Sequence, residues 1–299
     1  MIMPDRLTQT EIDQRVFDLY DEYCHGRLDR REFLHRASLL TIGGISALAM
    51  AEALLPQYAR AQTISFTDTR IKARYVTYPS PGGNDGQMRG YLVQPNARGP
   101  FPAVLVIHEN RGLNPYIEDV ARRVAVEGFV ALAPDGLFPL GGYPGNDGEG
   151  RTLQTTLDQG KLRTDMANSA RFLKAHALST GRLGVVGFCW GGSTTNFLAA
   201  TLGSEIHAAV PFYGAAAETA RVKDIKAPLL IQYAETDERV NAMWPAYEAA
   251  LKASGIAYEA HVYPGTQHGF HNNSTPRYHE PSAKLAWERT LAFFRKHLG

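Results

Sequence analysis

The stretch "RLGVVGFCWGGST", Arg182–Thr194, is the part of the sequence that decides the fold. An apolar run leads into a cysteine flanked by glycines, and a segment of helical spacing follows. Glycine stands two residues before Cys189 and again two and three residues after it. Such glycines allow a strand and a helix to approach closely around a residue at the apex of a sharp, strained turn. The stretch therefore predicts a strand, a nucleophile elbow with cysteine in place of serine, and a helix.

Segments of two kinds alternate along the chain on both sides of this turn. Apolar runs rich in β-branched residues are typical of buried parallel strands, and segments of helical spacing stand between them. The runs are "AVLVIHE", "VALAPD", "LGVVGFC", "AAVPFYG", "LLIQYAE" and "YEAHVY", and the candidate helices are 115–127, 156–178, 191–202, 241–254 and 282–298. Two earlier strands, "IKARYVTYPS" and "GYLVQP", predict an opening hairpin. We predict an α/β fold with a mostly parallel sheet and helices on both faces.

One stretch interrupts this alternation. Residues 136–151, "GLFPLGGYPGNDGEGR", hold too many glycines and prolines for a regular element, and loops of this length often serve as lids or substrate loops. No repeat or linker divides the rest, so we predict one domain over residues 62–299. The chain has 299 residues, 44% of them hydrophobic, and its net charge of +1 gives no basic field for nucleic acid. We therefore expect a globular protein without a nucleic-acid partner.

Cys189 is the candidate nucleophile. The dipole of the helix that follows would favour its thiolate, and the backbone N–H of Trp190 would be one oxyanion donor. A free cysteine is also often a small buried apolar residue, so the turn alone leaves a purely structural Cys189 open. Cys24 lies far away in a polar context, and we expect no disulfide between the two cysteines.

Two later segments favour catalysis. "LLIQYAETDERV" ends a predicted strand and puts Asp237 in the loop after it, and "VYPGTQHGF" does the same for His268. The order Cys, Asp, His at strand ends is that of an α/β-hydrolase. His268 would take the thiol or water proton, and Asp237 would fix its tautomer and stabilise the imidazolium. Taken singly, Asp237 as a turn-capping carboxylate and His268 as a structural loop histidine stay open.

The segment "VIHENRGLN", residues 106–114, ends the strand whose loop usually supplies the second oxyanion donor. Asn110 N–H is the candidate for this donor, and Glu109 stands close to where the nucleophile should project. The alternative for Glu109 is a surface ion pair with Arg111 or another arginine. Four further histidines lack the spacing of metal ligands, and we expect packing or surface roles for them: His108, His261, His271 and His279. No metal site is therefore predicted.

The motifs "HENRG", "GFCWGG", "ETDERV" and "YPGTQHGF" together resemble the dienelactone hydrolase family, also called carboxymethylenebutenolidases, over residues 70–298. The resemblance implies an α/β-hydrolase fold without metal or cofactor, and a triad of Cys189, Asp237 and His268. It also implies that Glu109 holds the resting thiol and lets it ionise toward the histidine when substrate binds. We therefore predict an enzyme that hydrolyses a small-molecule ester or lactone through an acyl-enzyme.

The resemblance predicts the nucleophile of this chain more firmly than it predicts the substrate. The resemblance places a carboxylate-binding arginine four residues after the catalytic histidine, and Asn272 stands there in this chain. Arg111, Arg151 and Arg277 are the candidate replacements, with solvated surface charges as the alternative. Two other classes of protein remain open: a non-catalytic ligand-binding protein of the same fold, and a thiol redox protein using Cys189. The redox class is disfavoured because no second cysteine lies near in the sequence.

Residues 1–61 have the features of a leader. The charged segment "DRREFLH" precedes an uncharged apolar run, Ala37–Ala51, and "ARA" ends at a candidate cleavage site between Ala61 and Gln62. Arg30 and Arg31 resemble the pair of a twin-arginine signal. The prediction is a removed signal peptide and export to the periplasm by the twin-arginine machinery. The alternative is a cytoplasmic protein that retains an N-terminal helix. The sequence predicts no oligomeric state.

Overall fold

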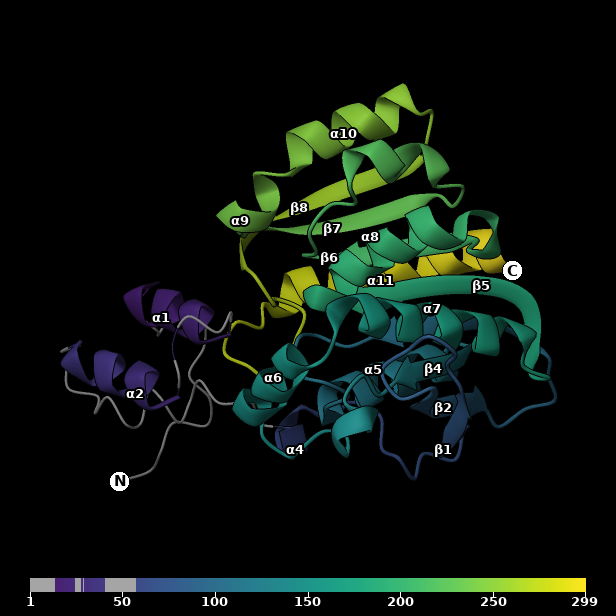
Figure 1. The fold of residues 1–299 in the computed structure, drawn as a ribbon, viewed down its shortest axis with the longest axis horizontal. Helices are drawn as coiled ribbons and strands as arrows, with labels where there is room; N and C mark the ends of the chain where they lie inside the picture. Colours follow the sequence, from purple (N-terminus) through teal and green to yellow (C-terminus); the bar gives the residue numbers. More distant parts are fainter. Residues whose placement is uncertain (1–13, 25–27, 29, 41–57) are drawn as a thin grey trace.

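An eight-stranded sheet forms the centre of the molecule (Figure 1). The computed structural model describes residues 14–24, 28, 30–40 and 58–299. Within them the strand order across the sheet is β1-β2-β4-β3-β5-β6-β7-β8. The strands are β1 (Ile71–Pro79), β2 (Gln87–Pro95), β3 (Phe101–Ile107), β4 (Val130–Pro134), β5 (Ser179–Phe188), β6 (Ala208–Phe212), β7 (Leu229–Thr236) and β8 (Tyr258–Gln267).

The sheet is antiparallel at one edge and parallel elsewhere. β1 and β2 form the predicted hairpin, and β2 pairs antiparallel with β4. From β4 through β3, β5, β6 and β7 to β8 every pairing is parallel. The carboxyl ends of the parallel strands therefore meet at one edge of the sheet, where loops of open α/β sheets carry ligand sites.

Helices cover both faces of the sheet, as predicted. Along β3, Ala103 and Leu105 belong to one apolar layer and Val104 and Val106 to the other, because side chains alternate across a strand. Helices α7, α8 and α10 supply the first layer, and α5 and α11 supply the second. The long helices are α5 (Pro115–Val126), α6 (Asp147–Thr156), α7 (Gln159–Ala175), α8 (Trp190–Leu202), α10 (Trp244–Ala253) and α11 (Glu280–Leu298). Short helical turns are η2 (Phe138–Leu140), η3 (Gly203–Glu205), η4 (Thr219–Asp224) and α9 (Glu238–Asn241).

The stretch at residues 136–151, which was expected to hold no regular element, differs from the prediction at its end. Its end is not irregular, because α6 begins at Asp147 with Asn146 as a side-chain cap. The helix predicted at 156–178 is α7, and α6 begins before it, inside the stretch expected to be irregular. Glycines inside α6 argue against a helix on propensity, yet close packing requires one of them: a β-carbon on Gly150 would lie 2.4 Å from the carbonyl oxygen of Arg111. The helix predicted at 241–254 is α10, and the short α9 ends at Asn241 before it.

Part of the predicted leader is helical. Helices α1 (Gln14–Cys24) and α2 (Arg30–Leu39) pack on each other, and α4 (Tyr58–Ala61) precedes the sheet. Residues 41–51, most of the predicted apolar run, lie outside the described residues. Ala61 is buried and its carbonyl accepts a 2.7 Å hydrogen bond from Asn273 Nδ2. Across the described ranges, no helix combines the length and apolarity needed to cross a membrane. Leader removal and export stay predictions.

Candidate active site

Cys189 lies at the turn between β5 and α8, at the apex of the strand–turn–helix unit that the sequence predicts. Its backbone has φ 56° and ψ −112°, a strained conformation for a residue with a side chain. Neighbouring backbone leaves no space for β-carbons: one on Gly191 would lie 2.3 Å from the carbonyl oxygen of Ile107, and one on Gly187 would lie 2.1 Å from that of Gly191. The strained turn projects Cys189 at the carboxyl edge of the sheet, where its side chain is partly exposed.

Asp237 and His268 meet next to this cysteine. Asp237 directly follows β7 and His268 directly follows β8, and these strands are parallel neighbours. His268 Nδ1 lies 2.6 Å from Asp237 Oδ2, and both side chains are buried. The charge of a Cys189 thiolate also raises the pKa of His268, so these two side chains lie near each other. The structure thus brings the three predicted residues together at the carboxyl edge of the sheet.

The electrostatics of this chain favour a charged histidine. Burial alone would lower the pKa of His268, but the charges of Asp237 and of a Cys189 thiolate outweigh burial and raise this pKa to about 10. Each of the two anions stabilises the imidazolium because it lies within contact distance in a poorly solvated site. The site can therefore hold a thiolate–imidazolium pair once Cys189 ionises.

Glu109 is a buried carboxylate beside the cysteine, 5% exposed, and not a surface residue. Asn272 Nδ2 donates a 3.0 Å hydrogen bond to Glu109 Oε2. The orientation of this amide is set by Ser274, whose backbone N–H and hydroxyl both donate to Asn272 Oδ1. Burial raises the pKa of Glu109, the charge of Arg111 opposes that rise, and a thiolate at Cys189 adds to it. The carboxylate and the thiolate therefore disfavour each other.

The three candidate substrate arginines are all buried: Arg111, Arg151 and Arg277. Their alternative reading as solvated surface charges is wrong. Arg111 does not pair with Glu109 but forms a 2.7 Å ion pair with Asp147 in the first turn of α6. Arg151 and Arg277 lie against aromatic rings of α1. The sequence has no signal for these contacts, because each joins segments far apart in the chain.

The two residues predicted to supply the oxyanion donors lie on different segments of the chain. Trp190 is the first residue of α8, and Asn110 lies in the turn after β3. His108 connects these segments: its ring stacks on Trp190 at 5.4 Å, and its Nδ1 donates to the carbonyl oxygen of Glu109. Its Nε2 accepts from Gly136 N–H, which assigns the neutral tautomer, and burial lowers the pKa of His108. His108 thus has the predicted packing role and holds the backbone around Glu109.

Tyr213, which follows β6, is a site residue that sequence reasoning missed. It is fully buried with φ 36°, and its ring lies 5.0 Å from the ring of His268. The Tyr213 ring therefore packs beside the ring of His268. A positive φ is rare for a bulky residue and leaves no mark in the sequence, so no pattern could have indicated this position.

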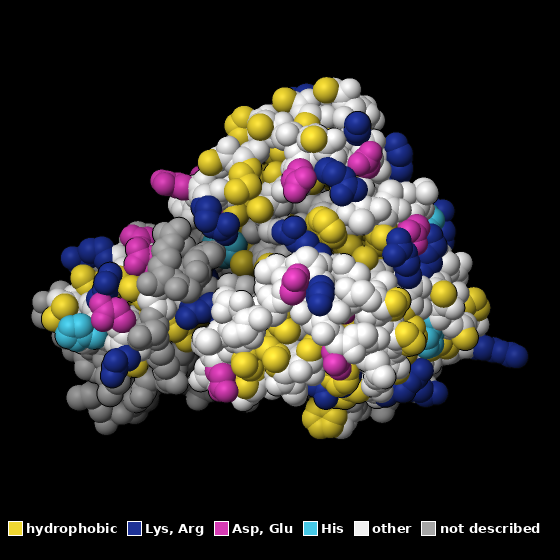
Figure 2. Space-filling view, in the orientation of Figure 1, with side chains coloured by type: hydrophobic (Ala, Val, Ile, Leu, Met, Phe, Trp, Pro, Cys, Tyr) yellow, Lys and Arg dark blue, Asp and Glu magenta, His cyan; other side chains and the backbone are white. Residues whose placement is uncertain are grey.

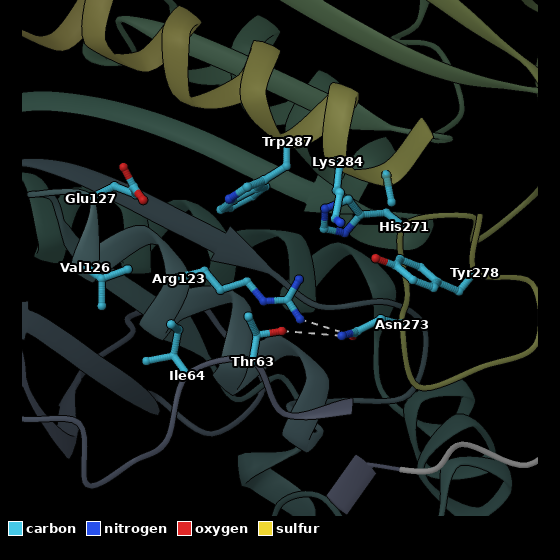
Figure 3. A pocket seen from close by; sticks show the side chains of 11 residues that line it. Thr63, Ile64, Arg123, Val126, Glu127, His271, Asn273, Tyr278, Lys284 and Trp287 are labelled. Carbon is cyan, nitrogen blue, oxygen red and sulfur yellow. Dashed lines mark hydrogen bonds between the residues drawn. The ribbon is translucent and has the colours of Figure 1, made fainter. Parts of the chain in front are cut away.

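A separate cavity of about 240 Å³ lies beside His271 (Figure 3). His271 is buried, with Tyr116 Oη 2.7 Å from its Nδ1 and its ring stacked on Phe188. The cavity is lined by Thr63, Ile64, Arg123, Val126, Glu127, His271, Asn273, Tyr278, Ala283, Lys284 and Trp287. None of these lining residues belongs to the predicted triad. Within the described ranges, no group of three or more His, Cys, Asp or Glu side chains is placed to hold a metal ion.

A nucleophile elbow at Cys189, followed in chain order by an acid and a histidine at the ends of later strands, places the protein in the α/β-hydrolase class. The chain belongs to the dienelactone hydrolase family, whose model matches residues 88–298, and it is a hydrolase. The fold and the family expected from the sequence are confirmed.

Known proteins support this assignment. The chain is 31% identical over 256 residues to a "Putative carboxymethylenebutenolidase" of Escherichia coli K12, covering 80% of this chain and 93% of that protein. The crystal structure titled "Putative Dienelactone Hydrolase" from Klebsiella pneumoniae is 30% identical, with a TM-score of 0.66, and the match covers 76% of this chain and 99% of that one. This chain is also 61% identical over 115 residues to the "Putative hydrolase fragment YghX" of Escherichia coli K12. That match covers 38% of this chain and 97% of the fragment. A second family model, YqhI-like, matches residues 3–41, the part that contains α1 and α2.

Proposed function

We propose that the protein hydrolyses an ester or lactone through a cysteine acyl-enzyme. The observation that carries the proposal is the strained elbow at Cys189 beside the hydrogen-bonded pair of His268 and Asp237. In this proposal Cys189 is the nucleophile, His268 the acid and base, and Asp237 the group that orients the histidine. The backbone N–H groups of Trp190 and Asn110 stabilise the oxyanion.

Acylation begins from the thiolate–imidazolium pair. The Cys189 sulfur attacks the acyl carbon and forms a C–S bond, and the carbonyl oxygen becomes the oxyanion. Collapse of this intermediate breaks the C–O bond of the ester or lactone. The proton of His268 goes to the leaving oxygen, so an alcohol departs, or stays tethered when the substrate is a lactone. The products of this half-reaction are a thioester and a neutral His268.

Deacylation needs His268 as a base. Acylation itself lowers the pKa of His268 and so favours its neutral, basic form. The thiolate is one of the charges that raise the pKa of His268, and a thioester carries no such charge. The pKa of His268 therefore falls in the acyl-enzyme, and the neutral ring can take a proton from water. Water attacks the thioester, the C–S bond breaks, and the thiolate–imidazolium pair returns with the free acid.

Glu109 controls the resting cysteine in this proposal. A buried carboxylate beside the sulfur opposes thiolate formation, so the free enzyme holds Cys189 largely as a thiol. A bound substrate displaces Glu109 from the sulfur, and the proton then passes to His268. This arrangement would protect the cysteine from alkylation and oxidation between turnovers.

The test is an assay with p-nitrophenyl esters of short acids and with lactones, with and without iodoacetamide. The wild type should hydrolyse members of this set and lose activity on alkylation. Cys189→Ala should lose the activity while its urea unfolding stays close to wild type. Cys189→Ser should retain little, because a serine hydroxyl ionises far less readily beside this histidine than a thiol does.

Two results would reject the proposal in favour of its rivals. Turnover by Cys189→Ala at the wild-type rate would show that Cys189 is not the nucleophile. Saturable binding of a lactone or aromatic acid by the wild type without any hydrolysis would identify a ligand-binding protein of the same fold.

A further inference from the structure

The cavity of about 240 Å³ beside His271, here called the His271 cavity, is lined by both α5 and α11. Four segments form its wall: residues 63–64, the end of α5, residues 271–278 after β8, and the first half of α11. Every lining residue follows the predicted cleavage point, so both possible forms of the chain contain all of them. The volume lies below the range of about 300–1,000 Å³ for drug-sized ligands, so the cavity fits a molecule with a single ring.

Arg123 of α5 is the buried cation of this wall, and its neighbours fix its orientation. Its Nε donates a 2.7 Å hydrogen bond to Asp119 Oδ2, and its Nη2 donates a 3.1 Å bond to Asn273 Oδ1. The side chain is 13% exposed. Its Nη1 donates to no group among the residues that the structure describes, and in Figure 3 it points away from Asn273 toward the His271 side of the cavity. The cavity therefore holds a fixed guanidinium with N–H groups left for a ligand.

The charges along the wall favour an anion at Arg123. Burial lowers the pKa of His271 well below its usual value, and the charge of Arg123 lowers it further, so this ring is neutral. Glu127 is the acid of the lining, and it forms an ion pair across to α11. The carboxylate of Asp119 is shared, because Arg122 Nη2 lies 3.5 Å from it. Asp119 therefore offsets only part of the charge of Arg123.

The rest of the wall fits a planar ring. The rings of Trp287 and His271 lie 5.5 Å apart, and Tyr278 stands next to His271 in Figure 3. Ile64 and Val126 add apolar surface. Aromatic rings attract one another in offset or edge-to-face contacts, and a guanidinium binds a carboxylate through charge-assisted N–H bonds. A ligand with one aromatic ring and a carboxylate satisfies both parts of the wall.

We propose that the His271 cavity is a second binding site, which takes an aromatic carboxylate of one ring, with the carboxylate on Arg123 and the ring against Trp287. It lies behind the elbow, because the His271 ring stacks at 5.2 Å on Phe188, the residue before Cys189. The lining includes no member of the predicted triad. The proposal therefore does not rest on the ester or lactone hydrolysis proposed above and is tested by binding alone.

The first experiment is isothermal titration calorimetry of the full-length protein with benzoate, benzamide and acetate. Benzoate should bind saturably at one site. Benzamide has the same ring but no charge, and acetate has the charge but no ring, so each should bind at least about tenfold more weakly. Alkylation of Cys189 by iodoacetamide, verified by mass, blocks the triad and should change the benzoate affinity by less than about twofold.

Substitutions in the wall locate the ligand. Arg123→Met should weaken benzoate binding at least about tenfold, because it removes a charge-assisted hydrogen bond. Trp287→Leu leaves the pair of Arg123 and Asp119 intact, and it should weaken binding about three- to tenfold through loss of the aromatic contact. If Arg123→Met does not fold, Trp287→Leu and the three ligands decide.

Arg171→Met is the matched control, because it removes one arginine far from the cavity. Arg171 belongs to α7, which covers the other face of the sheet, and it pairs with Glu205 at the surface. Figure 2 shows Lys and Arg side chains beside Asp and Glu side chains over the face in view, so such pairs are ordinary surface features. This variant should bind benzoate as the wild type does, and urea midpoints check that all three variants fold.

Three results would overturn the proposal: no saturable binding of benzoate, equal affinity for benzamide, or an affinity unchanged in both Arg123→Met and Trp287→Leu. Loss of binding after alkylation of Cys189 would place benzoate at the triad instead and would also overturn it. Absence of ester hydrolysis, by contrast, would reject the proposed function, and the binding results would still decide whether the second site exists.

Discussion

Asn272 is the residue at which this chain departs from the pattern of the family near the candidate site. It stands four residues after His268, where the resemblance places an arginine. A guanidinium there would be a second charge at the site, whereas the amide donates to Glu109 and accepts twice from Ser274. Asn272 therefore gives Glu109 a neutral hydrogen-bond partner. Burial raises the pKa of Glu109, the charges of Arg111 and Arg277 oppose that rise, and a thiolate at Cys189 adds to it.

The first prediction concerns Glu109. Glu109→Gln removes the charge that opposes the thiolate but nearly keeps size and hydrogen bonding. We expect faster alkylation of the free enzyme by iodoacetamide at pH 7 and a lower pH midpoint of alkylation, together with slower ester hydrolysis. The measurement is the rate of Cys189 labelling from pH 5 to 9 by mass spectrometry. Labelling identical to wild type at every pH would remove Glu109 from the mechanism and leave the triad intact.

The second prediction concerns the His268–Asp237 pair and pH. The folded-state pKa of His268, about 10, exceeds the unfolded value of about 6.5, so the pair contributes stability that is complete below pH 6.5 and is lost as pH rises toward 10. Asp237→Asn removes the carboxylate that raises this pKa. The difference in unfolding free energy between wild type and Asp237→Asn should therefore be largest near pH 6 and shrink toward pH 10. Urea titrations at pH 6, 8 and 10 measure it, and a constant difference would contradict the charged pair.

The three candidate triad residues could be singled out from the sequence because each stands in a local motif at a strand end. Cys189 is marked by its glycines, and Asp237 and His268 follow apolar runs directly. Their mutual contacts, and the burial of Arg277, depend on segments far apart in the chain and have no local signal. Sequence therefore gave the candidates, and only the folded chain separates the buried arginines from surface ones.

At the scale of the element, the elbow depends on backbone contact between β3, β5 and α8. Gly191→Ala would place a β-carbon 2.3 Å from Ile107 O and 2.5 Å from His108 O, which are rigid backbone atoms. We expect this variant to lose about 1–3 kcal/mol of unfolding free energy, the usual range for overpacking. Activity should fall as well, because the segment after β3, which carries Glu109, must shift.

Gly160→Ala in α7 is the matched control. Its new β-carbon would meet only the Asp158 carboxylate at 3.2 Å, and alanine has the better helix propensity. Its unfolding free energy should stay within about 1 kcal/mol of wild type. The urea midpoints of both variants are the measurement. Equal effects of the two substitutions would contradict the claim that Gly191 is required by the close backbone contact at the elbow.

Prediction of elements succeeded where an apolar run defined a buried strand and failed where packing overrode propensity. The parallel strands follow the runs, because burial on both faces demands continuous apolar sequence. Helix α6 was missed because Gly148 and Gly150, which disfavour a helix, are placed there for close contacts with Tyr23 and Arg111. Such contacts are tertiary and cannot be read from a window of sequence.

At the scale of the whole molecule, the question is whether the working enzyme keeps residues 1–61 or loses them. Tyr58 Oη donates to Asp147 and accepts from Asn114 Nδ2, so the residues before the predicted cleavage point contact the domain directly. We propose a retained N-terminus, the alternative that the sequence left beside export. Replacement of Arg30 and Arg31 by Lys should then leave the N-terminus unchanged, as measured by intact mass. A wild-type chain beginning at Gln62, and a longer cytoplasmic precursor in the Lys variant, would instead support twin-arginine export.

The central claim is that Cys189 carries the acyl group, and acid quenching during the first turnovers with a p-nitrophenyl ester tests it most directly. Mass spectrometry of the quenched protein should show an added acyl group on the peptide that holds Cys189, removable by hydroxylamine as a thioester is. The same adduct should be absent from Cys189→Ala. Full hydrolysis with no adduct on Cys189, or with an adduct on another residue, would contradict the account.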